Sequence, residues 1–257
     1  MEIDVLVINV GNSRMAMGAF VAGELTHVSR VSLKNPVDWP GAIAEAWRPL
    51  ANAADAAVVG ASVNPALVES IEQAAETATG RRVQWVGKQV DLPIKVLTEN
   101  PAATGVDRVL AVAAAYEQMQ KACVVVDAGT AITINVCDDK GSFLGGAIAP
   151  GAGTMLQSLS TNTANLPAVT LAVPSDVIGR STEDAIRNGV YHGLRGMVKE
   201  VVENYATELG TWPDIIATGG DARTLFDGWE LIHAISPDLV LYGIALAYAE
   251  HHIHHGT

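Results

Sequence analysis

The sequence predicts an α/β protein built from two similar domains, on the basis of three observations. β-rich runs alternate with stretches of helical spacing along the chain of 257 residues, as in sheets that are covered by helices. A pattern of strand, glycine turn and strand, VLVINVGNSRMAMGAF, returns as CVVVDAGTAITINVC. Asn9 and Asp127 occupy the same place in the two copies and are 118 residues apart, a distance close to half the length of the chain. We therefore predict a duplicated domain with mixed sheets flanked by helices, divided into residues 1–118 and 119–257, with a cleft between the two parts.

The first half opens on three β-rich runs that are separated by glycines, which predicts three strands. Apolar residues at helical spacing and short buried β-rich runs then alternate. A Pro- and Asn-containing loop over residues 92–105 leads into a helix. The expected strands are 3–10, 15–20, 24–32, 56–62 and 81–87, and the expected helices are 41–53, 65–79 and 108–119.

The second half repeats this order. Residues 121–151 read as three strands with a glycine turn and a turn at Asp139–Gly141, and a further strand is expected in DIIATGG, residues 214–220. The remaining long stretches have helical spacing. The expected helices are 155–161, 181–208 and 239–251.

The composition excludes several classes of protein. Hydrophobic residues make up 49% of the chain and charged residues 17%, which is typical of a globular domain rather than a disordered segment. Acidic residues outnumber basic ones by 28 to 16, so we expect no nucleic-acid partner and no membrane. Glu2 and Asp4 stand where a secretory signal has basic residues, which favours a cytoplasmic protein with Cys123 and Cys137 as buried free thiols. If a chain this acidic binds phosphates, it must do so through backbone amides and cations, with very few charged side chains.

The two glycine turns are candidate phosphate sites. A strand turned sharply at a glycine exposes successive backbone N–H groups, which can hold a phosphate without basic side chains. Each turn alone also fits a plain hairpin, and the phosphate interpretation rests on the symmetric pair. A third turn, ATGGDA, can lie against a nucleotide or be an ordinary strand-to-helix turn. The candidate nucleotide-binding residues, for which the resemblance given below implies ATP, are Asn9, Gly11, Asn12, Ser13, Arg14, Gly129, Thr130, Ala131, Gly219 and Gly220.

Two carboxylates are candidates for chemistry. Asp127 ends a buried apolar strand, where its charge needs a metal ion or, alternatively, the turn amides. Asn9 is its uncharged counterpart and a weaker ligand for Mg²⁺, which prefers carboxylate oxygen. Asp107 opens a helix after Gly105 and fits either a helix cap or a base that accepts a hydroxyl proton. Arg108 beside it can hold a carboxylate or phosphate, so the two form a candidate substrate pair.

Three further segments allow two interpretations each. The glycines in LGGAIAPG, residues 144–151, indicate a close backbone approach to a ligand better than a plain strand does. Ser181 and Thr182 precede two acidic residues and form a helix start, which is either a cap or part of a site. The tail carries His251, His252, His254 and His255, which we interpret as a solvated end rather than a zinc site.

In this order, these motifs closely resemble the type III pantothenate kinases, members of the acetate and sugar kinase, Hsc70 and actin superfamily. The resemblance covers nearly the whole chain. It implies two actin-like (ribonuclease H-like) domains and transfer of the ATP γ-phosphoryl group to the 4′-hydroxyl of pantothenate, the first step of coenzyme A synthesis. The segments that carry it are VGNSR (10–14), GVDR (105–108), DAGTAIT (127–133), GGAIAPG (145–151), GRSTEDAIRNG (179–189) and TGGDA (218–222).

The resemblance also implies roles for single residues. Asp107 would be the general base and Arg108 would contact pantothenate. Asp127 would help to bind a monovalent cation, K⁺ or NH₄⁺, and the first turn would handle phosphate and Mg²⁺. Thr182 would reach the pantothenate pocket across the interface of a homodimer. The complete set of substrate-binding candidates is Gly105, Val106, Arg108, Thr182 and Thr98.

Three positions depart from the family pattern. The family usually begins Asp-x-Gly-Asn-Thr, whereas this chain has Asn9 and Ser13. The second turn is usually followed by T-x-D, where this chain has Asn135, and a Tyr is common where Thr98 stands. Loss of the Mg²⁺-directed carboxylate leaves an alternative open, a non-catalytic nucleotide-binding or regulatory homologue that resembles the Bvg accessory factors.

Overall fold

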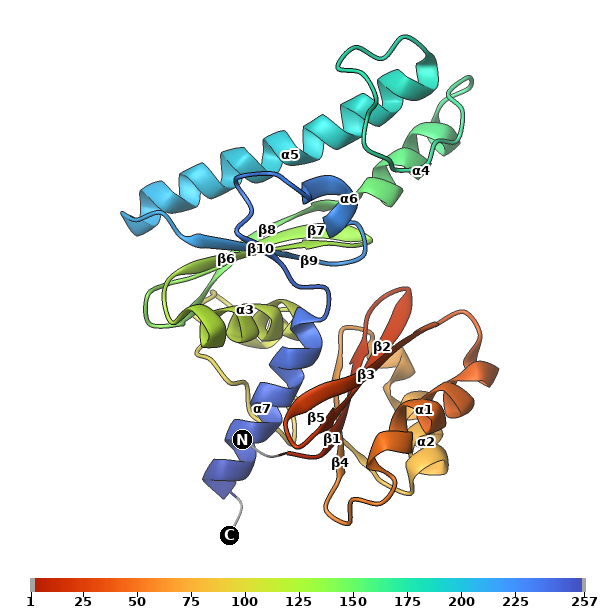
Figure 1. The fold of residues 1–257 in the computed structure, drawn as a ribbon, viewed down its shortest axis with the longest axis vertical. Coiled ribbons are helices and arrows are strands. Elements are labelled where there is room, and N and C mark those ends of the chain that lie inside the picture. Colours follow the sequence, from red (N-terminus) through yellow and green to blue (C-terminus); the bar gives the residue numbers. More distant parts are fainter. Residues whose placement is uncertain (1–2, 256–257) are drawn as a thin grey trace. The chain divides into compact units, whose positions relative to one another are not determined.

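The computed structural model describes residues 3–255, with side chains up to Ile253. Two mixed five-stranded sheets, each flanked by helices, form its framework (Figure 1). The chain divides into two compact units. The first unit comprises the residues up to Lys95, Glu99–Ala114 and the residues from Leu239 onward, and the second comprises Val96–Thr98 and Ala115–Asp238.

The first sheet has the strand order β3-β2-β1-β4-β5. β1 pairs antiparallel with β2 and parallel with β4. Two helices cover one face, where Leu6 and Ile8 pack with Trp39 and Ile71, and α7 (Leu239–His255) contacts β1, β2 and β4. The other elements are β1 (Val5–Val10), β2 (Arg14–Val21), β3 (Glu24–Ser32), β4 (Ala57–Ser62), β5 (Val83–Trp85), α1 (Trp39–Trp47) and α2 (Val68–Thr79).

The second sheet has the order β10-β9-β6-β7-β8. Read from the other edge, as β8-β7-β6-β9-β10, it matches the first sheet strand for strand, with β6, β7 and β8 in the places of β1, β2 and β3. This identity of topology confirms the predicted duplication and the fold class. The long helix α5 buries Val198 and Val202 against this sheet. Its elements are β6 (Cys123–Ala128), β7 (Ala131–Cys137), β8 (Phe143–Pro150), β9 (Asp214–Thr218), β10 (Ala234–Ile235), α4 (Ala152–Asn162), α5 (Thr182–Leu209) and α6 (Ala222–Phe226).

The predicted domains 1–118 and 119–257 differ from the compact units at three places: the segment Val96–Thr98, the end of α3 (Val106–Met119) from Ala115 on, and α7. The boundary predicted after residue 118 lies after Ala114 in the structure. α7, at the end of the chain, belongs to the first unit and not to the second. An apolar helix must be buried, yet its sequence does not say against which sheet. Contacts with β1, β2 and β4 decide this, so the chain leaves the first unit and returns to it.

Most predicted elements are observed, with small shifts at their ends. α3 (Val106–Met119) begins two residues before the expected helix, and the very short α6 and β10 were not expected. Four short 3₁₀ segments each have a proline at their first or second position. They are η1 (Pro36–Asp38), η2 (Arg48–Leu50), η3 (Pro65–Leu67) and η4 (Pro101–Ala103).

The two cysteines are buried free thiols, as predicted. Cys123 on β6 lies directly opposite Cys137 on β7, and their Sγ atoms are 3.3 Å apart. The hydrogen bond between the two thiols and the burial of Cys123 raise the pKa of the Cys123 thiol, so this thiol stays protonated. Among residues 3–255, no helix has the length and apolar character needed to cross a membrane.

Candidate active site

The first glycine turn joins β1 to β2. The Gly11 N–H donates to the Arg14 carbonyl at 3.1 Å and closes the turn. The carbonyl of Ser13 accepts a bond from the Leu33 N–H, also at 3.1 Å, which fixes the turn to the end of β3. Asn12, Ser13 and Arg14 are exposed. This part of the structure is therefore a rigid turn with exposed polar groups, as a phosphate site requires.

Asn9 is the fifth residue of β1 and lies between Ala16 on β2 and Ala61 on β4. Its Oδ1 atom is buried and has no hydrogen-bond partner among the described residues. A buried carbonyl oxygen without a partner is costly, so it fits a cation or a cation-bound water as its missing partner. The residues present therefore fit Mg²⁺, through a neutral oxygen in place of the family's carboxylate.

The second glycine turn joins β6 to β7 and is held from two sides. The Gly129 N–H donates to the Ala131 carbonyl at 3.0 Å. The Thr130 carbonyl accepts from the Gly151 N–H at 3.0 Å and from the Thr154 Oγ1 hydroxyl at 2.6 Å. Thr154 was not anticipated from the sequence, because a threonine one turn into a helix carries no signal of a contact with a distant loop.

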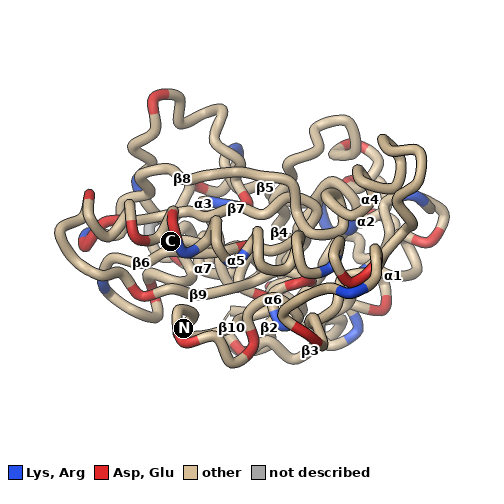
Figure 2. Tube along the Cα trace, turned by 90° about the horizontal axis from the view of Figure 1, so that it is seen from above, with Lys and Arg blue, Asp and Glu red and all other residues tan. Residues whose placement is uncertain are grey.

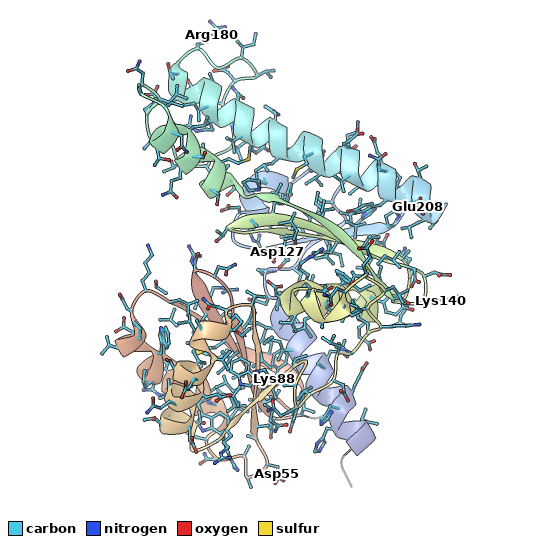
Figure 3. The ribbon with its side chains drawn as sticks, turned by 180° about the vertical axis from the view of Figure 1, so that it is seen from behind. Asp55, Lys88, Asp127, Lys140, Arg180 and Glu208 are labelled. Carbon is cyan, nitrogen blue, oxygen red and sulfur yellow. The ribbon has the colours of Figure 1, made fainter. Side chains whose placement is uncertain are left out.

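Asp127, labelled in Figure 3, is the fifth residue of β6 and so matches Asn9 on β1. It is half-buried and lies between Thr133 on β7 and Thr218 on β9. These hydroxyl neighbours replace the two alanines that flank Asn9. The second unit thus keeps a carboxylate in polar surroundings at the place where the first unit has an amide.

The TGGDA turn lies against Asp127. Gly219 has φ +92°, and a Cβ atom there would be less than 3.0 Å from both the Asp127 Oδ1 and the Ala128 carbonyl. Only glycine fits this approach. Gly220 has open space around its Cα. Of the two glycines predicted to contact nucleotide, Gly219 therefore packs on the carboxylate strand, whereas Gly220 makes no such contact.

Asp107 lies in the first turn of α3, within the first unit, and is half-buried. Its Oδ1 accepts the Arg108 N–H at 2.8 Å. Burial raises the pKa of this carboxyl above its ordinary value, and the hydrogen bond and charge of Arg108 oppose that rise. A carboxyl with a raised pKa at a helix start meets the requirement of a general base, and its bond to the Arg108 N–H also fits a helix cap.

The other substrate-binding candidates belong to the second unit. Thr98 ends a short segment that runs beside β8, where the Leu97 N–H donates to the Phe143 carbonyl at 2.9 Å. Thr182 is exposed at the first position of α5. Ser181 caps that helix, accepting the Asp184 N–H at 3.1 Å. The structure therefore brings Gly105, Val106, Asp107 and Arg108 together in one segment of the first unit, which does not include Thr98 or Thr182.

The glycines of residues 144–151 have an explanation within the chain. A Cβ atom at Gly146 would be less than 3.0 Å from the Ile134 carbonyl, and one at Gly151 would be equally close to the Gly129 carbonyl. The predicted close approach is therefore to the protein's own strand β7 and second turn. This accounts for Gly146 and Gly151, whereas Gly145, with φ +134°, has no such close neighbour and a ligand contact there stays a prediction.

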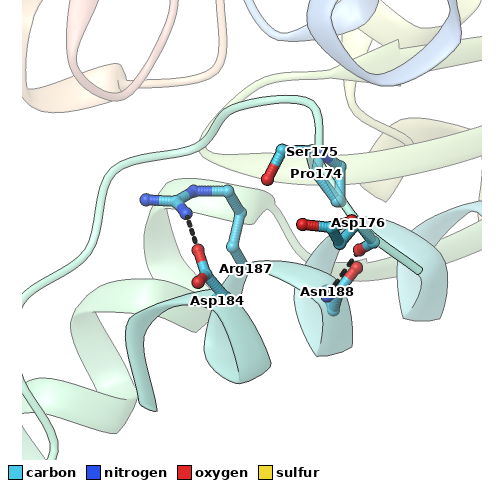
Figure 4. Close-up of a pocket in the computed structure, with 6 residues that line it drawn as sticks. All are labelled: Pro174, Ser175, Asp176, Asp184, Arg187 and Asn188. Carbon is cyan, nitrogen blue, oxygen red and sulfur yellow. Dashed lines mark hydrogen bonds and ion pairs between the residues drawn. The ribbon is translucent and has the colours of Figure 1, made fainter. Parts of the chain in front are cut away.

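A hollow beside the first turns of α5 is a separate feature (Figure 4). It is shallow, and Arg187 within it pairs with Asp184 at 2.9 Å. The Asn188 side-chain amide donates to the Asp176 carbonyl at 3.1 Å. None of the predicted site residues lines this hollow, whose lining residues are Pro174, Ser175, Asp176, Asp184, Arg187 and Asn188.

Charges and metal ligands are dispersed in the described part of the chain. In Figure 2, Lys and Arg positions are scattered among the acidic ones over the trace. No group of three His, Cys, Asp or Glu side chains among the described residues is placed to hold a metal ion. Of the tail histidines, His251 has its Nδ1 atom 3.7 Å from the Oδ2 atom of Asp91. The side chains of His254 and His255 lie outside the described residues.

A comparison with known protein families shows to which family a chain with these two glycine turns belongs. The family model described as type III pantothenate kinase matches residues 5–204. This chain belongs to the type III pantothenate kinase family. The match includes both glycine turns, the Gly105–Arg108 segment and the start of α5, so it confirms the resemblance seen in the sequence. Because the family consists of kinases, it also confirms the prediction of an enzyme.

Individual type III pantothenate kinases are similar in sequence to nearly the whole of this chain. A type III pantothenate kinase from Anaeromyxobacter sp. (strain K) is 36% identical over 248 residues, 95% of this chain and 98% of that protein. One from Myxococcus xanthus (strain DK1622) is 32% identical over 252 residues, 96% of this chain and 98% of that protein.

Solved structures agree with the fold. A Baf family transcriptional activator from Campylobacter jejuni has a TM-score of 0.59 at 20% identity, covering 95% of this chain and 98% of its own. MreB5 of Spiroplasma citri, bound to ADP, has a TM-score of 0.54 at 10% identity, covering 99% of both chains. These similarities confirm the actin-like fold class.

Proposed function

We propose that this kinase transfers the γ-phosphoryl group of ATP to the 4′-hydroxyl of pantothenate, the first step of coenzyme A synthesis. The observation that carries the proposal is Asp107. Its half-buried carboxyl, with a raised pKa, stands beside Arg108 at the start of α3 in a chain of the pantothenate kinase family. A carboxyl held in this way suits proton abstraction from an alcohol.

In this proposal each residue near Asp107 has a defined task. One carboxylate oxygen of Asp107 is oriented by the Arg108 N–H, and the carboxylate accepts the hydroxyl proton as the oxygen attacks. The guanidinium of Arg108 holds the carboxylate of pantothenate. Gly105 and Val106 are proposed to contact the substrate beside Arg108, and Thr98 and Thr182, in the second unit, are further proposed substrate-binding residues.

The two glycine turns bind ATP in this account. The exposed polar groups of Asn12, Ser13 and Thr130 face the phosphates, and Asp127 takes part in binding K⁺ or NH₄⁺. Asn9 would hold Mg²⁺, directly or through water, and the bound ion would neutralise charge on the phosphates. Recruited cations would thus supply the positive charge that an acidic chain lacks.

The test is release of ADP by the pure protein. With ATP, Mg²⁺ and K⁺ present, we expect ADP release to depend on pantothenate and to fall when K⁺ is replaced by Na⁺. A panel of small alcohols with and without a carboxylate checks the role of Arg108, because only acidic substrates should be used. Pantothenate-independent or absent ADP release by folded protein would contradict the proposal.

Replacing Asn9 with aspartate separates an active kinase from the alternative of a non-catalytic homologue. The variant restores a carboxylate at a buried oxygen that now has no partner among the described residues. We expect it to lower the Mg²⁺ concentration for half-maximal activity by about tenfold. Without Mg²⁺ the buried carboxylate should lower the melting temperature, and Mg²⁺ should restore it. Turnover only in Asn9→Asp, with none in the unmodified chain, would favour the non-catalytic homologue.

A homodimer is also part of the proposal, because three apolar side chains are exposed just before α5. Val173, Val177 and Ile178 are exposed by 61%, 88% and 72%. We propose that a second copy of the chain covers them, close to Thr182. Sedimentation should give a dimer, and Val177→Asp combined with Ile178→Asp should give a folded monomer. A dimer that persists in this variant would contradict the assignment of the surface.

A further inference from the structure

We propose that Thr154, in the first turn of α4, is a positioning residue that aims the backbone N–H of Ala131 at the phosphates of ATP. The inference deepens the proposed function, since it rests on nucleotide binding at the second glycine turn. It assigns a task to a residue outside every motif identified in the sequence.

The geometry begins at the Thr130 carbonyl, at the tip of the turn. This oxygen accepts two hydrogen bonds from the start of α4, one from the Gly151 N–H at 3.0 Å and one from the Thr154 hydroxyl at 2.6 Å. Two donors on one carbonyl fix the direction of the peptide plane between Thr130 and Ala131.

Fixing that plane also fixes the Ala131 amide. In a trans peptide the C=O and the following N–H point to opposite sides. With the Thr130 carbonyl tied to α4, the Ala131 N–H is therefore directed away from α4. Thr130 and Ala131 are both exposed residues, and in this proposal the anion approaches the Ala131 N–H at the tip of the turn.

The first turn uses a related device, which supports a functional reading of the second. There the Ser13 carbonyl accepts the N–H of Leu33, the residue that follows β3. In the second unit Gly151 follows β8 and makes the matching bond to Thr130. In the second unit Thr154 adds a side-chain donor to this common arrangement.

Packing does not explain Thr154. Its side chain is exposed, so removing the hydroxyl leaves no buried cavity. Gly151 already provides the close contact of α4 with the turn, since a Cβ atom there would be less than 3.0 Å from the Gly129 carbonyl. The hydroxyl of Thr154 therefore contributes direction to the turn rather than core stability.

The test compares Thr154→Val, which keeps the shape and loses the hydroxyl, with Thr154→Ser, which keeps the hydroxyl. Thr161→Val is the matched control, because its hydroxyl donates to the Gln157 carbonyl at 2.9 Å in the same helix, away from the turn. Calorimetry with Mg-ATP and an NMR titration with adenosine give the two affinities, and a melting curve reports the fold.

We expect Thr154→Val to weaken ATP binding by about fivefold, the value of one hydrogen bond, with adenosine affinity and melting temperature unchanged. Thr154→Ser and Thr161→Val should bind ATP like the unmodified protein. Equal loss of ATP and adenosine affinity, or unchanged ATP affinity in Thr154→Val, would overturn the inference. Because the readout is binding, a failure of pantothenate turnover leaves it standing, whereas unmodified protein that binds no ATP overturns both proposals.

Discussion

The Asp107→Asn variant is expected to lose about 10²–10⁴-fold in kcat, because an amide cannot accept the proton of the substrate hydroxyl. ATP affinity should stay unchanged, since both glycine turns lie elsewhere in the sequence. Steady-state ADP release together with ATP calorimetry measures the two effects separately. Glu69→Gln, which removes the acidic residue in the first turn of α2, is the matched control and should keep full turnover.

The pH dependence of the unmodified enzyme follows from the same carboxyl. Burial raises the pKa of Asp107 above its ordinary value of 3.8. Because the base works only when deprotonated, kcat/KM should fall as the pH drops through this raised pKa. An acidic limb at the ordinary carboxyl value, or unchanged turnover in Asp107→Asn, would show that another residue is the base.

Stability should respond in the opposite direction. The folded protein holds the Asp107 proton to a higher pH than the unfolded chain does, so stability falls as the pH rises from 3.8 through the raised pKa. Asp107→Asn removes this cost. Near neutral pH the variant should therefore melt at a higher temperature than the unmodified protein, and well below 3.8 the two should melt alike.

The Gly219→Ala variant is expected to show the second large effect. Its Cβ would lie less than 3.0 Å from the Ala128 carbonyl and from the Asp127 Oδ1, on a backbone with φ +92°. Left-handed strain and overlap with backbone together should cost about 2–5 kcal/mol in the free energy of unfolding. Displacement of Asp127 should also weaken ATP binding and remove the response to K⁺.

Gly228→Ala is the control for backbone strain alone, because Gly228 has φ +67° and no atom of another residue lies within 4 Å of the place that a Cβ would take there. It should cost about 1–2 kcal/mol and leave ATP affinity unchanged. Chemical denaturation and calorimetry on both variants make the comparison. Equal losses in the two would mean that contact with the Asp127 strand has no special role.

Much of the fold could be predicted because local pattern and global topology agree. Apolar alternation around Gly11 and Gly129 specifies two hairpins, and their repetition at half the chain length predicts two sheets of the same order. The match of Asn9 to Asp127, read from sequence alone, holds in the strand register. The change from a Pro- and Asn-containing loop to helical spacing also placed Asp107 at a helix start, where the structure has it.

What the sequence could not predict depends on contacts between distant segments. α7 is apolar and could cover either sheet, so its membership of the first unit required the packed structure. The glycines at 146 and 151 have a simple sequence pattern, but their neighbours Ile134 and Gly129 are brought to them only by strand pairing. Thr154 escaped notice for the same reason, since its partner is a carbonyl 24 residues away.

The most direct measurement of the central claim is the identity of the product. Unmodified protein is incubated with ATP, Mg²⁺, K⁺ and pantothenate, and the product is analysed by mass spectrometry and by phosphorus–proton coupling in NMR. We predict one phosphate added to pantothenate on the 4′ oxygen, with ADP formed in equal amount. Folded protein that binds ATP but leaves pantothenate unmodified, or that phosphorylates a different position, would contradict this account.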